Sequence, residues 1–411
     1  MSTAGHVTKD IVQVYERIVK RVLWGPGKRA KIRLPVLYLP KRFGGLGLTD
    51  ISVRDHAIKC YWVPRILTSE EWGDAVASLF GYQGRIVFFC NLHPRHVQQL
   101  YPHLNSRWTA ILESWCKLTY EEDRPSDWKE SRVWLHSQIL VAGSPVYWHE
   151  ACVRGLVQLK HMYCGDQLLT PEELVYRYNM PMMQANQLLS AVGSYMRLPK
   201  VKRKSTKTKI LNDMLAINGP KPSKNAYVEL CKRQITTLKS RCQYWNEKLH
   251  MSLTLSAFVK KVSKSLHLLS HPRAISVQFR HCNNAIFAKD RLYRWGLVTT
   301  SECPACSCSH TVRHMLFECN AVKPLIKWMA MAYVARTEIN YYELVFADTE
   351  SKELNRVLLL YKWYVYRSFC SEQNINVHKF KSWIHQFINN HVYIREKRKM
   401  WKFSLKLPLI T

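Results

Sequence analysis

The amino-acid sequence predicts a mainly α-helical protein built from several parts. The chain has 411 residues, 47% of them hydrophobic, which is enough to form two or three separate cores. Apolar residues recur at spacings of three and four along much of the chain, the pattern of amphipathic helices. A basic stretch almost free of apolar residues interrupts this pattern near residue 200. We therefore expect connected helical segments rather than one compact domain.

The N-terminal segment predicts a helix that begins near Asp10 and ends at residues 25–27. Asp10 and Gln13 are suited to cap its start, and a Gly-Pro-Gly sequence ends it. Its apolar residues follow helical spacing on two adjacent faces: Val14, Ile18 and Val22, and Ile11, Tyr15 and Val19. Residues 28–49 contain short apolar runs broken by proline and glycine. They predict strand-like or irregular chain, followed by a helix from about Asp50.

Further helices are predicted in the middle and at the C-terminal end of the chain. Thr170, Pro171 and Glu173 supply a capping hydroxyl, a proline at the first helical position and a glutamate that completes a capping box. Near the end, two more amphipathic helices are indicated by Leu354, Val357, Leu358 and Tyr361, and by Phe380, Trp383, Ile384 and Phe387.

These signals divide the chain into six predicted segments. The run from Pro199 to Lys209 carries six basic residues and cannot pack a core, so it predicts a linker or arm. The predicted segments are an N-terminal part (1–70), a helical middle region (71–198), a basic linker (199–225), a helical segment (226–300), a cysteine-rich knuckle (301–320) and C-terminal helices with a basic tail (321–411).

The charge of the chain favours a polyanionic partner. Lys and Arg number 61 against 30 Asp and Glu, which gives a formal net charge of +31. An excess of this size predicts binding to RNA, DNA or both. The thirteen cysteines follow no secretory signal, so we expect a reducing intracellular compartment, the nucleus or the cytoplasm, with most thiols free and buried. No apolar run is long enough for a membrane helix, and membrane attachment is not expected.

Two groups of basic residues are candidates for contacts with phosphates, because they belong to glycine-rich or linker sequence where charged side chains stay solvated. They are Lys28, Arg29, Lys31, Arg33, Lys41 and Arg42, and Lys202, Arg203 and Lys204. Aromatic and basic residues alternate in RLYRWG (291–296) and YKWYVYR (361–367). Such rings either stack on unpaired bases or fill the core.

The sequence CPACSCSHTVRHMLFEC, residues 303–319, predicts a zinc site. Zinc prefers four nitrogen or sulfur ligands in a tetrahedron, and two cysteines separated by two residues reach it from one turn. Cys303, Cys306, His314 and Cys319 give the spacing C-x2-C-x7-H-x4-C, while Cys308 and His310 remain alternative ligands. Four protein ligands close the coordination sphere, so this zinc is expected to stabilise the fold and not to catalyse.

The chain resembles the C-terminal half of the reverse transcriptases of LINE-type, non-LTR retrotransposons. Four landmarks occur in order, from roughly Lys9 to Tyr393. The first resembles the end of a polymerase thumb: VLWGPGKRAKIRLPVLYLPKRFGGLGLTDISVRDHAIKCYWVPRIL. The others are SPVYWHEACVRGLVQLKHMYCGDQLLTPEELVYRYNM, AYVELCKRQITTLKSRCQYWNEKL and KDRLYRWGLVTTSECPACSCSHTVRHMLFEC, the last similar to the family's zinc-binding segment. The resemblance implies a thumb-like segment at residues 1–70 and a grip on template RNA and on the primer-template duplex.

The chain departs from this family in its catalytic residues. These polymerases need two adjacent carboxylates for a pair of metal ions, and the chain contains no Asp-Asp dipeptide. Asp348 in Phe-Ala-Asp-Thr lies after the knuckle, where no palm is expected. Residues 320–411 also lack the Pro-Asp pair of a restriction-like endonuclease. His149-Glu150 lacks the second histidine of a helical zinc protease.

We therefore expect a non-catalytic nucleic-acid-binding protein with a structural zinc, with little sequence preference. Two alternatives remain open at this point. The chain is either a fragment of an active RNA-directed DNA polymerase whose palm lies on a separate polypeptide, so that its partner is the rest of a retrotransposon polymerase, or a protein-interaction scaffold whose aromatic residues meet a partner.

Overall fold

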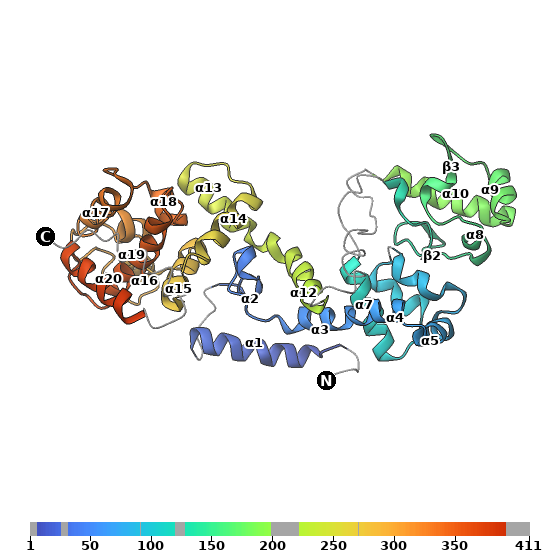
Figure 1. The fold of residues 1–411 in the computed structure, drawn as a ribbon, viewed down its shortest axis with the longest axis horizontal. Coiled ribbons are helices and arrows are strands. Elements are labelled where there is room, and N and C mark those ends of the chain that lie inside the picture. The colour runs from blue at the N-terminus through green and yellow to red at the C-terminus, as the bar shows by residue number, and fades with distance from the viewer. Residues whose placement is uncertain are drawn as a thin grey trace. The chain divides into compact units, whose positions relative to one another are not determined.

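The protein is mainly helical, as predicted (Figure 1). The computed structural model describes residues 6–25, 32–90, 92–119, 128–198, 222–269 and 271–391. Within these ranges the only sheets are two short antiparallel hairpins, in which β1 (Leu140–Val141) pairs with β2 (Ser144–Pro145) and β3 (Tyr163–Cys164) pairs with β4 (Gln167–Leu168). None of the described helices combines the length and the apolar character needed to cross a membrane.

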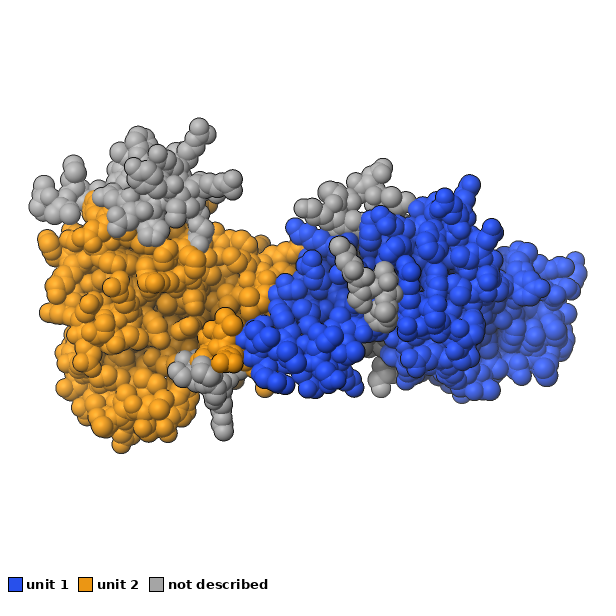
Figure 2. Space-filling model, turned by 90° about the horizontal axis from the view of Figure 1, so that it is seen from below, with its two compact units in different colours: residues 1–19, 49–231 blue, residues 20–48, 232–411 orange. Residues whose placement is uncertain are grey.

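The chain forms two compact units, each made of two separate stretches of sequence (Figure 2). Unit 1 comprises residues 1–19 and 49–231, and unit 2 comprises residues 20–48 and 232–411. The predicted N-terminal segment 1–70 thus contributes to both units. The finer division into six segments remains a prediction, and most of the predicted linker lies outside the described residues.

Unit 1 holds two apolar clusters. One is built around Trp115 of α7 and the other around Trp134, and both indole rings are almost fully buried. The helices that belong to this unit, in whole or for the greater part, are α1 (Lys9–Trp24), α3 (Ile51–Cys60), α4 (Trp62–Thr68), α5 (Glu71–Phe80), η2 (Gly81–Phe89), η3 (Pro94–His96), α6 (Val97–Leu100), α7 (Ser106–Thr119), η4 (Trp128–Glu130), α8 (His149–Val153), η5 (Leu159–Met162), α9 (Pro171–Tyr178), α10 (Met182–Arg197) and α12 (Pro222–Lys232).

Unit 2 is organised around one long buried helix, α19, which contacts α15, α17, α20 and the short π-helical turn η8. Its helices are α2 (Leu34–Tyr38), η1 (Lys41–Phe43), η7 (Arg233–Leu238), α13 (Lys239–Leu249), α14 (Leu255–Leu266), α15 (Pro272–Cys282), α16 (Lys289–Arg294), η8 (His314–Glu318), α17 (Lys323–Val334), α18 (Tyr341–Phe346), α19 (Lys352–Cys370) and α20 (Val377–His391). The two predicted C-terminal helices are therefore confirmed as α19 and α20.

Local start signals in the sequence are confirmed where they are complete. The capping box of α9 forms as predicted: Glu173 N–H donates to Thr170 Oγ1 at 3.2 Å, and Thr170 N–H donates to Glu173 Oε2 at 2.7 Å. Asp50 caps α3 by accepting from Val53 N–H at 3.1 Å. The predicted cap of α1 at Asp10 is wrong, because the helix begins at Lys9 and Thr8 Oγ1 faces Ile11 N–H at 3.5 Å.

Between the first two predicted helices, the expectation of irregular chain is confirmed for residues 44–50, but it is wrong for α2 and η1, which are short helical turns. Pro35 does not break a helix but stands in the first turn of α2, where its missing N–H costs no hydrogen bond. The glycines that follow are required by close packing. A Cβ on Gly45 would lie 1.9 Å from the Leu39 carbonyl oxygen, and Gly44 has a left-handed φ of +82° and lies against Val262 of α14. The two glycines thus allow the chain after α2 to turn sharply and to pack against α14 within unit 2.

Candidate metal centre and nucleic-acid interface

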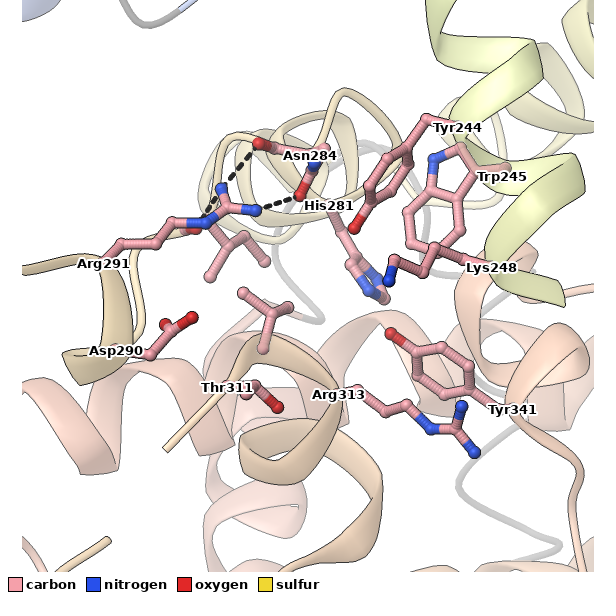
Figure 3. A pocket seen from close by; sticks show the side chains of 12 residues that line it. Tyr244, Trp245, Lys248, His281, Asn284, Asp290, Arg291, Thr311, Arg313 and Tyr341 are labelled. Carbon is pink, nitrogen blue, oxygen red and sulfur yellow. Dashed lines mark hydrogen bonds between the residues drawn. The ribbon is translucent and has the colours of Figure 1, made fainter. Parts of the chain in front are cut away.

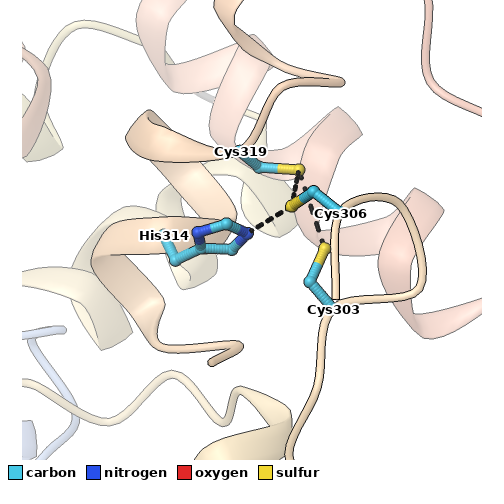
Figure 4. A group of neighbouring side chains, drawn as sticks. All are labelled: Cys303, Cys306, His314 and Cys319. Atoms are coloured by element: carbon cyan, nitrogen blue, oxygen red, sulfur yellow. Dashed lines mark hydrogen bonds between the residues drawn. The ribbon is translucent and has the colours of Figure 1, made fainter. Parts of the chain in front are cut away.

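The structure brings the four predicted zinc ligands together (Figure 4). The ligand atoms of Cys303, Cys306, His314 and Cys319 all lie within 4.8 Å of one another. Among the residues that the structure describes, they are the one group of His, Cys, Asp and Glu side chains placed to hold a metal ion. His149-Glu150 is not part of such a group, and His149 instead packs against the ring of Tyr82, with the centroids 4.9 Å apart.

The spacing of the four atoms fits a tetrahedral ion. Cys319 Sγ lies 3.7 Å from Cys303 Sγ and 3.8 Å from Cys306 Sγ. A Zn–S bond of about 2.3 Å places two sulfurs of a tetrahedron about 3.8 Å apart, whereas a disulfide would bring them to about 2.0 Å. His314 Nε2 lies 3.1 Å from Cys306 Sγ, so the imidazole nitrogen occupies the fourth corner. A thiolate-rich set of this kind suits zinc.

Two short pieces of backbone hold the ligands. Cys303 and Cys306 belong to a tight turn in which Ser307 N–H donates to the Cys303 carbonyl at 2.9 Å and Ser307 takes a left-handed φ of 54°. The other two ligands flank the turn η8, where Cys319 N–H donates to the His314 carbonyl at 2.8 Å. This hydrogen bond closes one loop that fixes both His314 and Cys319.

The pKa values of the ligand side chains favour a bound cation. Burial raises the pKa of the Cys319 thiol to about 12, so its thiolate needs a positive charge nearby. Burial also acts to raise the pKa of Cys306, but hydrogen bonds from Cys303 and from backbone N–H groups outweigh it and lower that pKa. Burial lowers the pKa of His314, which keeps the imidazole in the neutral form that binds metal.

The two alternative ligands lie outside the tetrahedron. Cys308 is exposed and contributes its carbonyl oxygen, which accepts from Cys303 N–H at 2.8 Å. His310 is buried, and its Nδ1 accepts from Lys289 N–H at 3.0 Å. Cys308 therefore supports the backbone of the turn and His310 supports the start of α16, and neither belongs to the group placed to bind the metal.

The predicted phosphate-binding residues are described only in part. Lys28, Arg29, Lys31, Lys202, Arg203 and Lys204 lie outside the described residues. Arg33, Lys41 and Arg42 are exposed and belong to unit 2, the unit that also carries the metal cluster. Arg42 lies over the ring of Phe43, with the guanidinium carbon 5.0 Å from its centroid.

Arg33 is part of a group of like charges that the sequence did not reveal. Arg241 of α13 is half-buried, and burial together with the charges of Arg291 and Arg33 lowers its pKa. The three guanidinium groups come from positions far apart in the chain. Like charges held close together destabilise a protein unless an anion lies among them. The group is therefore a candidate site for phosphate.

The two aromatic and basic sequences have opposite environments. In residues 291–296, Tyr293 and Trp295 are 51% and 56% exposed. In residues 361–367, Tyr361 and Lys362 are fully buried and Trp363 and Tyr364 nearly so. The first sequence offers rings to a ligand, and the second belongs largely to the core of α19.

The Phe-Ala-Asp-Thr sequence has a structural role. Phe346 and Ala347 are buried, and the Asp348 carboxylate forms ion pairs with Lys261 at 2.6 Å and Lys264 at 2.5 Å. These contacts lower the pKa of Asp348 although burial opposes them. Asp348 thus ties the end of α18 to α14.

Comparison with known proteins adds no relative to these observations. No protein-family model matches the chain, and no curated protein sequence matches it.

Proposed function

We propose that this protein binds RNA or DNA without catalysing a reaction, and that a structural zinc ion folds the part of unit 2 that carries the interface. The relation to the C-terminal half of a non-LTR reverse transcriptase belongs to the same proposal. In that setting the protein would grip nucleic acid beside a polymerase palm.

The metal cluster supports a structural role for the ion. Cys303 and Cys319 are buried, and the four side chains supply the full set of ligands that tetrahedral zinc accepts. A water or substrate then has no coordination position. The ion joins the turn at residues 303–308 to η8, which packs on α19.

The group formed by Arg33, Arg241 and Arg291 is the observation that carries the proposal. A half-buried arginine whose pKa is lowered by burial and then by the charges of two other arginines is an unfavourable arrangement in the free protein. Phosphate groups of a nucleic acid would relieve it, and the net charge of +31 would attract them over long range.

The salt dependence of binding tests this proposal. Affinity for a single-stranded RNA and for a DNA duplex is measured by fluorescence anisotropy at several salt concentrations. We expect log K to fall linearly with log salt, with a slope that becomes less steep by about 0.7 to 0.9 for each phosphate that a variant no longer neutralises. Arg33→Gln combined with Arg241→Gln should flatten the slope by about 1.5.

Arg154→Gln provides the control, because Arg154 is an exposed arginine of unit 1. It should leave the slope unchanged. An affinity of the wild-type protein that stays flat from low to moderate salt would contradict the proposal.

A further inference from the structure

Unit 2 contains a cavity of about 270 Å³ (Figure 3). Its walls come from α13, the C-terminal end of α15, α16, the residues just before His314, and α18. Arg313, which lines the cavity, directly precedes the ligand His314. The volume is near the lower end of the range of ligand pockets, which begins at about 300 Å³, so the cavity suits one small planar group.

Aromatic rings form one part of the cavity. Tyr244 and Trp245 approach from α13 and Tyr341 from α18, and the hydroxyls of both tyrosines point into the space between these helices (Figure 3). Trp245 is held in place, because its indole N–H donates to the Cys282 carbonyl at 2.7 Å. Trp245 is only 3% exposed, and its ring lies 5.2 Å from that of Tyr244, so it supports Tyr244 as a surface that needs little ordering when a flat ligand binds.

A buried histidine faces the same space without a hydrogen bond. His281 is 1% exposed, and within the described part of the chain neither of its ring nitrogens has a hydrogen-bond partner. Its ring projects between Tyr244 and Lys248 in Figure 3. Burial, followed by the charge of Lys362, lowers its pKa well below the usual value, so it is a neutral imidazole with one donor and one acceptor. Such groups are rarely left unpaired in folded proteins.

The other end of the cavity carries charges of both signs. Arg291 is anchored by its hydrogen bonds to Asn284 and to the Ile286 carbonyl, and these use three of its five N–H groups. Asp290 uses Oδ2 to bind Arg294, while Oδ1 is buried without a partner among the described residues. The cavity therefore presents guanidinium donors next to a carboxylate acceptor.

This combination fits a nucleotide. A base has a flat face that can stack on the tyrosine rings. Its edge carries both donors and acceptors, which can form hydrogen bonds with His281 and Asp290 Oδ1. A phosphate would bind the arginines, including the neighbouring Arg241. Bases in a duplex are stacked and paired, and only an unpaired base can enter a cavity.

We propose that this cavity captures one unpaired nucleotide of a single-stranded RNA or DNA. The inference rests on the proposed function and adds to it a preference of the protein for single strands. Because every base has a flat face and an edge with hydrogen-bonding groups, the preference should be nearly independent of sequence.

The test compares single-stranded and duplex oligonucleotides of equal length in fluorescence anisotropy. Tyr244→Ala removes one ring and should weaken single-strand binding about tenfold while leaving duplex affinity within about twofold. Tyr244→Phe keeps the ring and should bind like the wild type. Tyr342→Ala is the matched control, because Tyr342 is adjacent to Tyr341 on α18 but does not line the cavity. Zinc content and circular dichroism verify that each variant is folded.

The outcomes separate this inference from the proposed function. If the wild-type protein binds neither oligonucleotide, the proposed function fails and the cavity assignment fails with it. If it binds both but Tyr244→Ala changes neither affinity, or changes both by the same factor, only the cavity assignment is overturned. Adenosine monophosphate that competes as strongly as a single strand at equal nucleotide concentration would assign the cavity to a free nucleotide and overturn the single-strand proposal.

Discussion

Two clusters of charged and polar side chains, one in each unit, differ in whether they are complete by themselves. In unit 1, His6 Nδ1 lies 2.9 Å from Asp55 Oδ2, and Lys59 of the same helix as Asp55 pairs with the other carboxylate oxygen. His6 Nε2 lies 3.3 Å from Glu113, an ionic contact rather than a well-aligned hydrogen bond. Opposite charges therefore neutralise one another inside this cluster.

In unit 2 the residues around Arg241 bring charges of one sign together, and some buried polar atoms have no partner among the described residues. Burial and then the like charges of Arg291 and Arg33 lower the pKa of Arg241, and the buried ring nitrogens of His281 have no hydrogen-bond partner in the described structure. The Cys319 thiol likewise needs a cation to ionise, because burial raises its pKa to about 12. The charges of the unit 1 cluster thus balance one another, whereas we propose that the groups in unit 2 receive ions: a metal cation at the cysteines and phosphates at the arginines.

The largest expected effect comes from removing the metal. Cys303→Ser takes away one ligand, so the protein should lose its zinc and unit 2 should lose several kcal/mol of stability, because the energy of metal binding is part of the energy of folding. Hydrogen exchange should accelerate in α19 and remain unchanged in α7 of unit 1. Metal content and residue-resolved exchange measure both changes.

Cys308→Ser is the control for this prediction. Cys308 is in the same turn but exposed and outside the tetrahedron, so the variant should keep one zinc per chain. Loss of zinc from Cys308→Ser, or full zinc content in Cys303→Ser, would show that the ligand assignment is wrong.

The next largest effect should arise in unit 1. Asp55→Asn leaves the buried ammonium of Lys59 without its carboxylate, and should cost about 3 kcal/mol in the free energy of unfolding. Chemical denaturation followed by the fluorescence of Trp115 and its neighbours measures it. Asp166→Asn is the control, because Asp166 pairs with Lys129 at a fully exposed position and should change nothing measurable.

The same cluster predicts how the stability of unit 1 depends on pH. Burial acts to raise the pKa of Asp55. Hydrogen bonds from His6 and Lys59 outweigh burial and lower this pKa from 3.8 to about 2. The stability that this carboxylate contributes is complete above pH 3.8 and is lost as the pH falls through 2. The hydrogen bond to Asp55 and the contact with Glu113 raise the pKa of His6, so its contribution is complete below pH 6.5 and is lost as the pH rises through the raised value. Asp55→Asn should weaken both dependences.

Structural features can be predicted from the sequence where they depend on residues close together in the chain. The capping box of α9 and the four metal ligands each lie within a short stretch whose chemistry depends on few other residues. The stretch that forms α2 was misjudged because a proline can either break a helix or begin one, and packing against the rest of unit 2 decides between them.

Features that depend on distant residues could not be predicted. Arg33 was a candidate from its neighbourhood in sequence, but nothing local indicated that Arg241 and Arg291 would join it. The two aromatic and basic stretches have similar composition, yet one is exposed and the other lies mostly within α19. Only the arrangement of helices determines which rings are available to a ligand.

The smallest expected effect is the pH dependence of stability that Lys362 causes. Measuring it tests whether this buried lysine of unit 2 lacks a neighbouring group of opposite charge. Lys362 is fully buried, and its ammonium donates to Gln278 Oε1 and, at 3.1 Å, to the Val345 carbonyl. Burial lowers its pKa to about 7. Between pH 7 and 10.5 the unfolded chain binds this proton and the folded chain does not, so stability should rise with pH, by at most about 1.4 kcal/mol per pH unit.

Lys362→Met should abolish this rise, because methionine carries no proton that folding must remove. Lys352→Met, at an exposed lysine of the same helix, should retain the rise. The measurement belongs between pH 7 and 8.5, since burial raises the pKa of the nearby Cys282 to about 11 and its titration acts in the opposite direction above pH 9. Equal pH dependence in wild type and Lys362→Met would show that Lys362 is neutralised by a group of opposite charge, which would make the core of unit 2 resemble the closed cluster of unit 1.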